Sequence, residues 1–262
     1  MTARGQRTSR RSRGAYRGSR SRSRLAKGIT AKGDFRPPLT EEHPASVTSA
    51  RPLLRGYIHA GAALVAALGG TYLVVLSKGD WPRQLSMLVY GAGLTLLLAV
   101  SAIYHVHTWT PARRAILRRV DHANIFVLIA ATYTPLAFNV LSGWWRVGIL
   151  GAAWGAALVG VGAAVAGVQL RRRVRAGLYV GVGWIALAAL GQISAALPWP
   201  AIGLLIAGGV LYSAGALLYA RRWPDPWPRV FGYHEVFHLL TIAAAVAFYV
   251  VVLVYVLPAP RP

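Results

Sequence analysis

The chain has 262 residues, of which 55% are apolar and 14% are charged, well below the roughly 25% charged residues of an average soluble domain. It contains no cysteine, which excludes disulfides, thiolate nucleophiles and cysteine-ligated metals. Lys and Arg outnumber Asp and Glu by 29 to 7. Such a net positive charge suggests nucleic acid as a partner, but the positions of the basic residues along the chain matter more than their number. The composition indicates a protein whose solvent is lipid.

The first 52 residues form an Arg- and Ser-rich segment that we expect to be disordered. Fourteen of the 29 Lys and Arg precede Tyr57, and hardly any residue from Thr2 to Lys32 is apolar, so the segment cannot bury enough surface to offset its ordering entropy. No apolar stretch follows for about fifty residues, which argues against a cleaved signal peptide. The segment is predicted to be a cytoplasmic tail attracted to anionic lipid headgroups, with nucleic acid the less favoured partner.

Residues 53–262 form a second domain, in which long apolar runs alternate with short polar connections. Each run is long enough to cross a hydrocarbon core about 30 Å thick at about 1.5 Å per residue, and a helix satisfies its backbone groups within one segment. The sequence therefore predicts an all-α, seven-transmembrane helix bundle in the cell membrane. The predicted spans are Tyr57–Leu76, Leu85–His105, Asp121–Leu141, Trp144–Leu170, Leu178–Leu197, Ala201–Tyr219 and Tyr233–Leu257.

The basic residues between these spans predict the orientation of the bundle. With seven spans, the N-terminal tail shares one side of the membrane with the second, fourth and sixth connections. Those connections carry Arg113, Arg114, Arg118, Arg119, Arg171, Arg172, Arg173, Arg175, Arg221, Arg222 and Arg229. The other side has only Lys78, Arg83, Arg146 and Arg261. By the positive-inside rule, the N-terminus is expected in the cytoplasm and the C-terminus outside.

Ionisable residues inside the spans are few, and each is a candidate for function because charge is costly in lipid. Ser101 and His105 end the second span, Asp121 opens the third, and His234 and His238 open the seventh. The predicted topology places all three of these segment ends at the cytoplasmic face. Side chains that are distant in sequence are therefore expected to lie at one depth in the bilayer.

The two histidines of the seventh span suggest a metal site. They are four residues apart, so both imidazoles project from one face of a helix. If His105 supplies a third nitrogen, the set leaves a position open for water, as a catalytic Zn²⁺ requires. Asp121 is then the expected general base or water-orienting group, and Ser101 can hydrogen-bond the water or a developing oxyanion. Three imidazoles also suit other divalent ions.

Several of these residues have simpler interpretations. Asp121 could be the N-cap of the third span. His107 and His122 are expected at the membrane interface, beyond the site and without a chemical role. His59, near the cytoplasmic end of the first span, is expected to pack or hydrogen-bond between helices rather than bind the metal.

A protease is a further alternative, because His234-Glu-Val-Phe-His238 matches the H-E-x-x-H pattern of zinc metalloproteases. Glu235 would be the base in such an enzyme. An intramembrane protease would be expected to supply a later Asp ligand, and no carboxylate follows His238. The protease is therefore the less favoured hypothesis.

Five segments appear in order along the chain and carry a family resemblance: Arg55-Gly-Tyr-Ile-His59, Ser101-Ala-Ile-Tyr-His105, Asp121, Thr132-Tyr-Thr-Pro135 and His234-Glu-Val-Phe-His238-Leu. From about Leu53 to Leu257 the chain resembles the hemolysin III family, which belongs with the adiponectin and progestin receptors (PAQR proteins) and the alkaline ceramidases. The resemblance implies a seven-helix fold with zinc near the cytoplasmic leaflet. It also implies His105, His234 and His238 as ligands, with Asp121 and Ser101 as the polar partners.

The function predicted from these features is zinc-dependent hydrolysis of an amide or ester bond in a membrane lipid. Members of the wider group hydrolyse lipid amides such as ceramide, and a site at headgroup depth suits a lipid substrate or ligand. The alternative is a non-enzymatic receptor, a pore-forming (haemolytic) protein or a stress-response membrane protein in which zinc is structural, because one fold can serve both kinds of function.

Overall fold

The computed structural model describes residue 52, residues 54–227 and residues 229–262. The expected disordered tail, residues 1–52, lies outside the described residues except for Pro52. Within the described part of the chain, regular structure is helical, apart from one isolated bridge between Trp227 and Phe231. The prediction of an all-α fold is confirmed.

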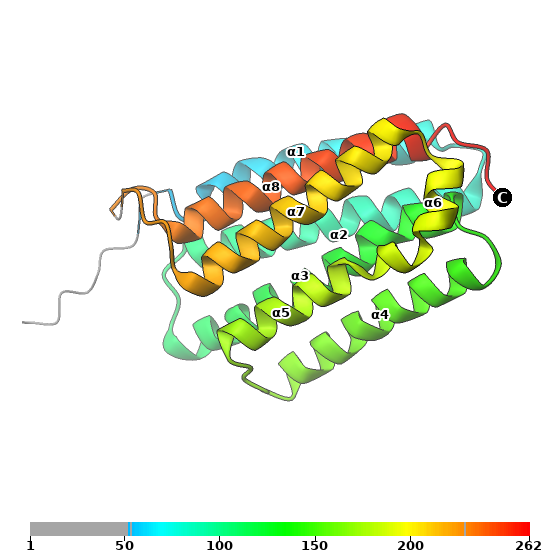
Figure 1. Cartoon of the computed structure of the whole chain (residues 1–262). Coiled ribbons are helices and arrows are strands. Elements are labelled where there is room, and N and C mark those ends of the chain that lie inside the picture. The colour runs from blue at the N-terminus through cyan, green and yellow to red at the C-terminus, as the bar shows by residue number, and fades with distance from the viewer. Residues whose placement is uncertain (1–51, 53, 228) are drawn as a thin grey trace, which may run out of the picture. The chain divides into compact units, whose positions relative to one another are not determined.

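The helices of the unit Thr48–Pro262 run alongside one another as a bundle (Figure 1). α8 contacts both α7 and α1, α5 contacts α7 and α3, and α1 to α4 pack in sequence order. The elements are α1 (Tyr57–Leu76), α2 (Trp81–Val106), α3 (Pro111–Asn139), α4 (Gly143–Val165), α5 (Arg172–Gly183), the 3₁₀ helix η1 (Ile185–Ala189), α6 (Leu190–Ala196), α7 (Trp199–Arg221), α8 (Tyr233–Val251) and the π-helix η2 (Val252–Val256).

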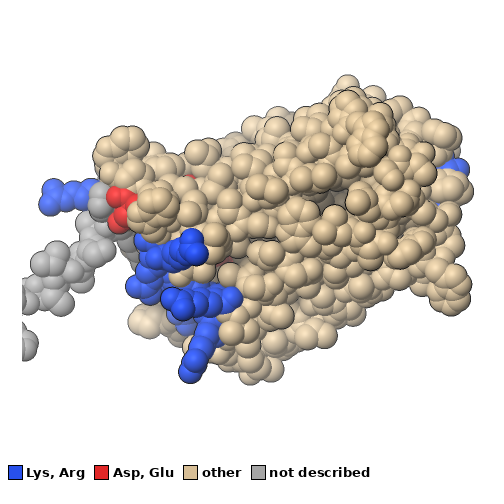
Figure 2. Space-filling model, viewed as in Figure 1, with Lys and Arg blue, Asp and Glu red and all other residues tan. Residues whose placement is uncertain are grey.

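The surface of this unit is suited to lipid. Six of the crossing segments are long and apolar enough to span a membrane: α1, α2, α4, α5 to α6, α7, and α8 with η2. Large apolar side chains such as Leu64, Leu68 and Val159 are exposed. Soluble proteins rarely expose wide apolar surfaces of this kind to water. Figure 2 shows Lys and Arg gathered mainly at one end of the viewed face, beside a long uncharged surface. The chain is a multi-pass membrane protein.

α3 is not among these six segments, and other helices cover its polar side chains. It contacts α2, α4 and α5 and buries Asn124, Thr134 and Asn139, side chains that would be costly against lipid. It begins at Pro111 with Thr110 at the N-cap position, rather than at Asp121. The interpretation of Asp121 as a helix cap is therefore wrong, since this residue lies inside the helix.

The fifth span is broken, although the sequence predicted one continuous helix over Leu178–Leu197. α5 ends at Gly183, and η1 separates it from α6. The Tyr133 hydroxyl of α3 lies 3.2 Å from the Val182 carbonyl oxygen and 2.5 Å from that of Gly183, and it accepts a hydrogen bond from the Ala186 amide at 3.2 Å. Backbone groups at membrane depth need partners within the protein, and Tyr133 supplies them at this break.

Two glycines allow α1 and α2 to approach closely. A Cβ on Gly70 would lie 2.8 Å from the Cα of Gly91, and a Cβ on Gly91 would lie 2.7 Å from the Cα of Gly70. In a membrane, close packing of this kind supplies helix association that the hydrophobic effect does not. The contact holds the helix that carries His59 against the helix that carries Ser101 and His105.

Candidate metal centre

Three histidines meet at the end of the bundle where α2 ends and α8 begins. One ring nitrogen of each of His105, His234 and His238 lies within 4.8 Å of the others, and the Nε2 atoms of His105 and His234 are 3.1 Å apart. The i, i+4 spacing on α8 places His234 and His238 side by side, with ring centroids 4.6 Å apart. The last turn of α2 brings His105 to them.

The burial and donor set of this cluster suit a metal ion. His238 is buried, and its Nδ1 has no hydrogen-bond partner among the described residues. A buried ring nitrogen left unpaired costs free energy. Three neutral imidazoles are a donor set that Zn²⁺ takes in catalytic sites, where a fourth position stays open. His105, His234 and His238 therefore fit the zinc site implied by the resemblance.

The start of α1 supports the cluster from one side. The His59 ring stacks on the His238 ring, with centroids 3.8 Å apart and planes 12° from parallel, but it is not part of the group of converging ring nitrogens. Gly56 adopts a left-handed conformation, φ 86°, and a Cβ there would lie 2.9 Å from the His105 Cβ. His59 thus has the packing role expected for it, and Gly56 lets the chain pass close to α2.

Glu235 does not face the cavity beside the histidines. Its side chain is fully buried, and Oε1 lies 2.9 Å from the Nε of Arg55. Oε2 accepts a hydrogen bond from the Gly232 amide at 2.9 Å, which satisfies a backbone donor at the start of α8. Because both oxygens are engaged, the geometry speaks against Glu235 as the base of an H-E-x-x-H protease. Its role here is to anchor the first turn of α8 to the chain before α1.

Ser101 and Asp121 lie in the same cavity as the three histidines. Ser101 belongs to α2 and Asp121 to α3, so the cavity brings polar side chains of the two helices together. Ser101 is buried and Asp121 is partly buried. His122, which we expected beyond the site, also lines the cavity, whereas His107 is exposed.

A cavity of about 450 Å³ extends from the histidines into the bundle. Its lining away from the histidines is mostly apolar and includes Leu136, Ile202 and Val256. His234 and Val256 lie at opposite ends of the segment formed by α8 and η2, roughly 30 Å apart at 1.5 Å per residue. An elongated apolar space with a polar end has the form of a site for an acyl chain.

Fold and site together define a class: helical membrane proteins with a three-histidine cluster at one end of the bundle. Residues 47–249 match the family described as Haemolysin-III related. The chain belongs to this family, within the PAQR superfamily. The resemblance that the sequence motifs indicated is confirmed.

Similar proteins include two from bacteria and one from a plant. The hemolysin-3 homolog of Bacillus subtilis (strain 168) is 29% identical over 175 residues, 67% of this chain and 79% of that protein. Hemolysin-3 of Bacillus cereus is 31% identical over 173 residues, 65% of this chain and 74% of that protein. The heptahelical transmembrane protein ADIPOR2 of Oryza sativa subsp. japonica is 32% identical over 191 residues, 66% of this chain and 80% of that protein.

Proposed function

We propose that this protein is a zinc-dependent hydrolase of amide or ester bonds in membrane lipids. The observation that carries the proposal is the place of the three histidines, with Asp121 and Ser101, at the polar end of an elongated apolar cavity. An acyl chain within the cavity would present its carbonyl group to this polar end. Such a substrate explains why the reactive side chains lie inside a membrane bundle rather than on a loop.

The residues divide the chemistry between them. Zinc held by His105, His234 and His238 would polarise the carbonyl group and lower the pKa of a water molecule toward about 7. Asp121 takes the proton of the attacking water as general base and delivers it to the leaving amine or alcohol. Ser101, which lines the same cavity, orients that carboxylate. The bond between the acyl carbon and the nitrogen or oxygen breaks, releasing a fatty acid.

The wall of the cavity supports entry of a lipid from the bilayer. Leu187 of η1 and Ile206 of α7 line the cavity, yet they are 50% and 45% exposed. The cavity therefore reaches the side of the bundle between the broken fifth span and α7. A lipid can enter there without leaving the hydrocarbon, and the apolar lining excludes bulk water from the reaction.

Metal content and turnover test the proposal together. Full-length protein purified in detergent should contain stoichiometric zinc by inductively coupled plasma mass spectrometry, and a His234→Ala/His238→Ala variant should contain none. The wild type, but not the variant, should release fatty acid from a panel of N-acyl and O-acyl lipids followed by mass spectrometry. Zinc without turnover across the panel would favour the receptor or pore alternative with structural zinc. Well-folded wild type without metal would overturn the mechanism.

A further inference from the structure

Five arginines line the cavity; Arg55 is paired with Glu235, and the other four are not used by the proposed hydrolysis. Arg114 and Arg118 belong to α3, and Arg172 and Arg175 belong to α5; we call these four residues the basic rim. Asp121 is the one carboxylate among the described residues that line the same cavity. The polar end therefore carries a large excess of positive charge beside the histidine cluster.

The basic rim is not neutralised by ion pairs. Among the described residues, no carboxylate oxygen lies within 4.0 Å of its guanidinium nitrogens. Arg172 is held instead by Tyr219: its Nη1 donates to the Tyr219 carbonyl at 3.2 Å, and its Cζ lies 4.7 Å from the Tyr219 ring centroid. Guanidinium groups oriented in this way keep donors free for an anion, and their planar fork matches a phosphate or carboxylate.

The basic rim lies next to the groups proposed to react. The Tyr219 ring that holds Arg172 also contacts the His234 ring, with centroids 5.4 Å apart. Arg175 lines the same cavity as Asp121. An anion bound at the rim would therefore sit beside the position of the acyl carbonyl.

Membrane topology alone does not account for this arrangement. The positive-inside rule requires basic residues near the cytoplasmic face but does not require them to line a cavity. Arg171 and Arg173 are exposed and lie outside the cavity lining, whereas Arg172 and Arg175 of the same segment are partly buried and belong to it. On α3, Arg114 and Arg118 are exposed and line the cavity, and the neighbouring Arg113 does not.

We propose that the ligand of this cavity is a lipid with an anionic headgroup, such as a phosphate, which the basic rim binds while the acyl chain fills the apolar part. The inference rests on the proposed function for the use of the cavity, and it adds the charge class of the substrate. Zwitterionic and neutral lipids of the same chain length are expected to bind more weakly, because they lack the net negative charge that four unpaired arginines favour.

Binding of fluorescent lipids to the full-length protein in neutral detergent tests this inference separately from turnover. The probes are lysophosphatidic acid and lysophosphatidylcholine that carry the same chain-end fluorophore, followed by fluorescence polarisation. Wild type should bind the anionic probe at least about tenfold more tightly. Arg172→Gln/Arg175→Gln should lose this preference, and Arg171→Gln/Arg173→Gln, which removes the same charge from the same segment, should keep it within about twofold.

The remaining outcomes are decided by further variants. If Arg172→Gln/Arg175→Gln does not fold, Arg114→Gln/Arg118→Gln on α3 replaces it with the same expected loss. Equal loss in the rim and control pairs, or equal affinity of wild type for both probes, would overturn the inference even if the protein hydrolyses lipids. Displacement of the anionic probe by inorganic phosphate at equal concentration would assign the rim to a soluble phosphate instead. A preserved headgroup preference without any turnover would overturn the hydrolase and leave the headgroup site standing.

Discussion

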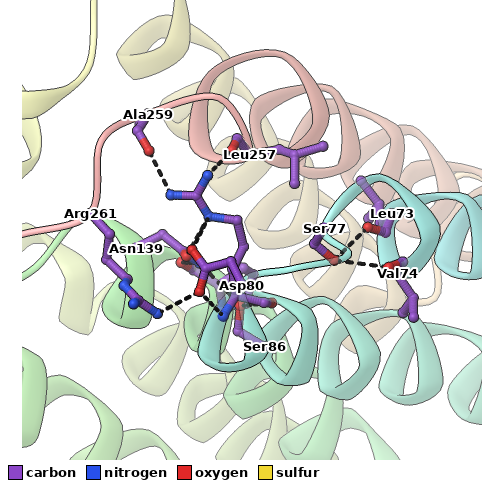
Figure 3. Close-up of polar contacts among 11 residues, drawn as sticks. Leu73, Val74, Ser77, Asp80, Ser86, Asn139, Leu257, Ala259 and Arg261 are labelled. Atoms are coloured by element: carbon purple, nitrogen blue, oxygen red, sulfur yellow. Dashed lines mark hydrogen bonds and ion pairs between the residues drawn. The ribbon is translucent and has the colours of Figure 1, made fainter.

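The two ends of the helical unit use their polar side chains in opposite ways. At the end away from the histidines, Asp80, Asn139 and Arg261 bond to neighbouring side chains, and carbonyls of the C-terminal segment are bound as well (Figure 3). Arg83 donates to Asn139 Oδ1 at 3.2 Å and to the carbonyl oxygens of Leu257 and Ala259 at 2.5 and 2.7 Å. At the histidine end, the four arginines of the basic rim face a cavity without a carboxylate partner.

This difference suggests that the polar groups at one end stabilise the fold, whereas those at the histidine end serve the proposed function. Paired polar groups hold the C-terminal segment and the helices in place, whereas unpaired basic groups that line a cavity remain available to a ligand. One pair at the histidine end belongs with the stabilising kind: Arg55 and Glu235, 2.9 Å apart, fix the start of α8. Substitutions at the two ends should therefore have different readouts.

The largest effect is expected for Asp121→Asn at the histidine end. The amide cannot accept the proton of the attacking water, so turnover should fall by about 10²- to 10⁴-fold while zinc content stays at the wild-type level. The measurement is fatty acid release per zinc-loaded protein. Asp80→Asn at the other end makes the same chemical change and should leave that rate within about twofold of wild type. Retained turnover in Asp121→Asn, with loss in Glu235→Gln, would return Glu235 to the role of base.

The next largest effect is expected for Arg55→Ala, as a lower free energy of unfolding. It leaves the fully buried Glu235 carboxylate without its cation, which costs about 3–5 kcal/mol when a buried pair is broken. The midpoint of thermal unfolding in detergent should fall accordingly. Arg55→Ala/Glu235→Gln should recover part of the loss, because the amide oxygen still accepts from Gly232 and carries no charge. A double variant as unstable as the single one would show that Arg55 acts through packing instead.

The smallest of these effects is expected for Arg83→Gln at the paired end. It removes hydrogen bonds to Asn139 and to two carbonyls near the C-terminus, a loss of about 1–3 kcal/mol for groups left unsatisfied. Zinc content and the turnover of folded protein should not change. Lys78→Gln, an exposed residue at the same end, is the control and should match wild type in unfolding. Loss of zinc in Arg83→Gln would show that the two ends are coupled.

The sequence could predict what depends on contact with lipid. Long apolar runs and alternating basic connections report directly on the bilayer, so the crossing segments and their order could be derived. The topology by itself brings Ser101, His105, Asp121, His234 and His238 to one depth, and in the folded chain they surround one cavity. The cytoplasmic placement of that end rests on the charge asymmetry.

The sequence could not predict what depends on partners from distant helices. Arg55 and Glu235 are 180 positions apart, and only the motif around Arg55 hinted at its importance. The first turns of α3 carry Arg113 and Arg114, so in hydropathy they look like a loop, although they are helical. The break of the fifth span comes at Gly181 and Gly183, and its backbone groups bond to Tyr133 of α3, a partner distant in sequence.

Because of that break, the fifth span consists of two short helices joined by a 3₁₀ turn rather than one continuous helix. α5 has no buried residue of its own, and the oxygen of Tyr133 serves three backbone groups where α5 meets η1. A hydroxyl has one proton to donate, so the carbonyls of Val182 and Gly183 compete for it. The two halves of the fifth span are therefore positioned separately: α5 packs on the core through the partly buried Tyr179 and Val182, and α6 packs through the buried Ile193.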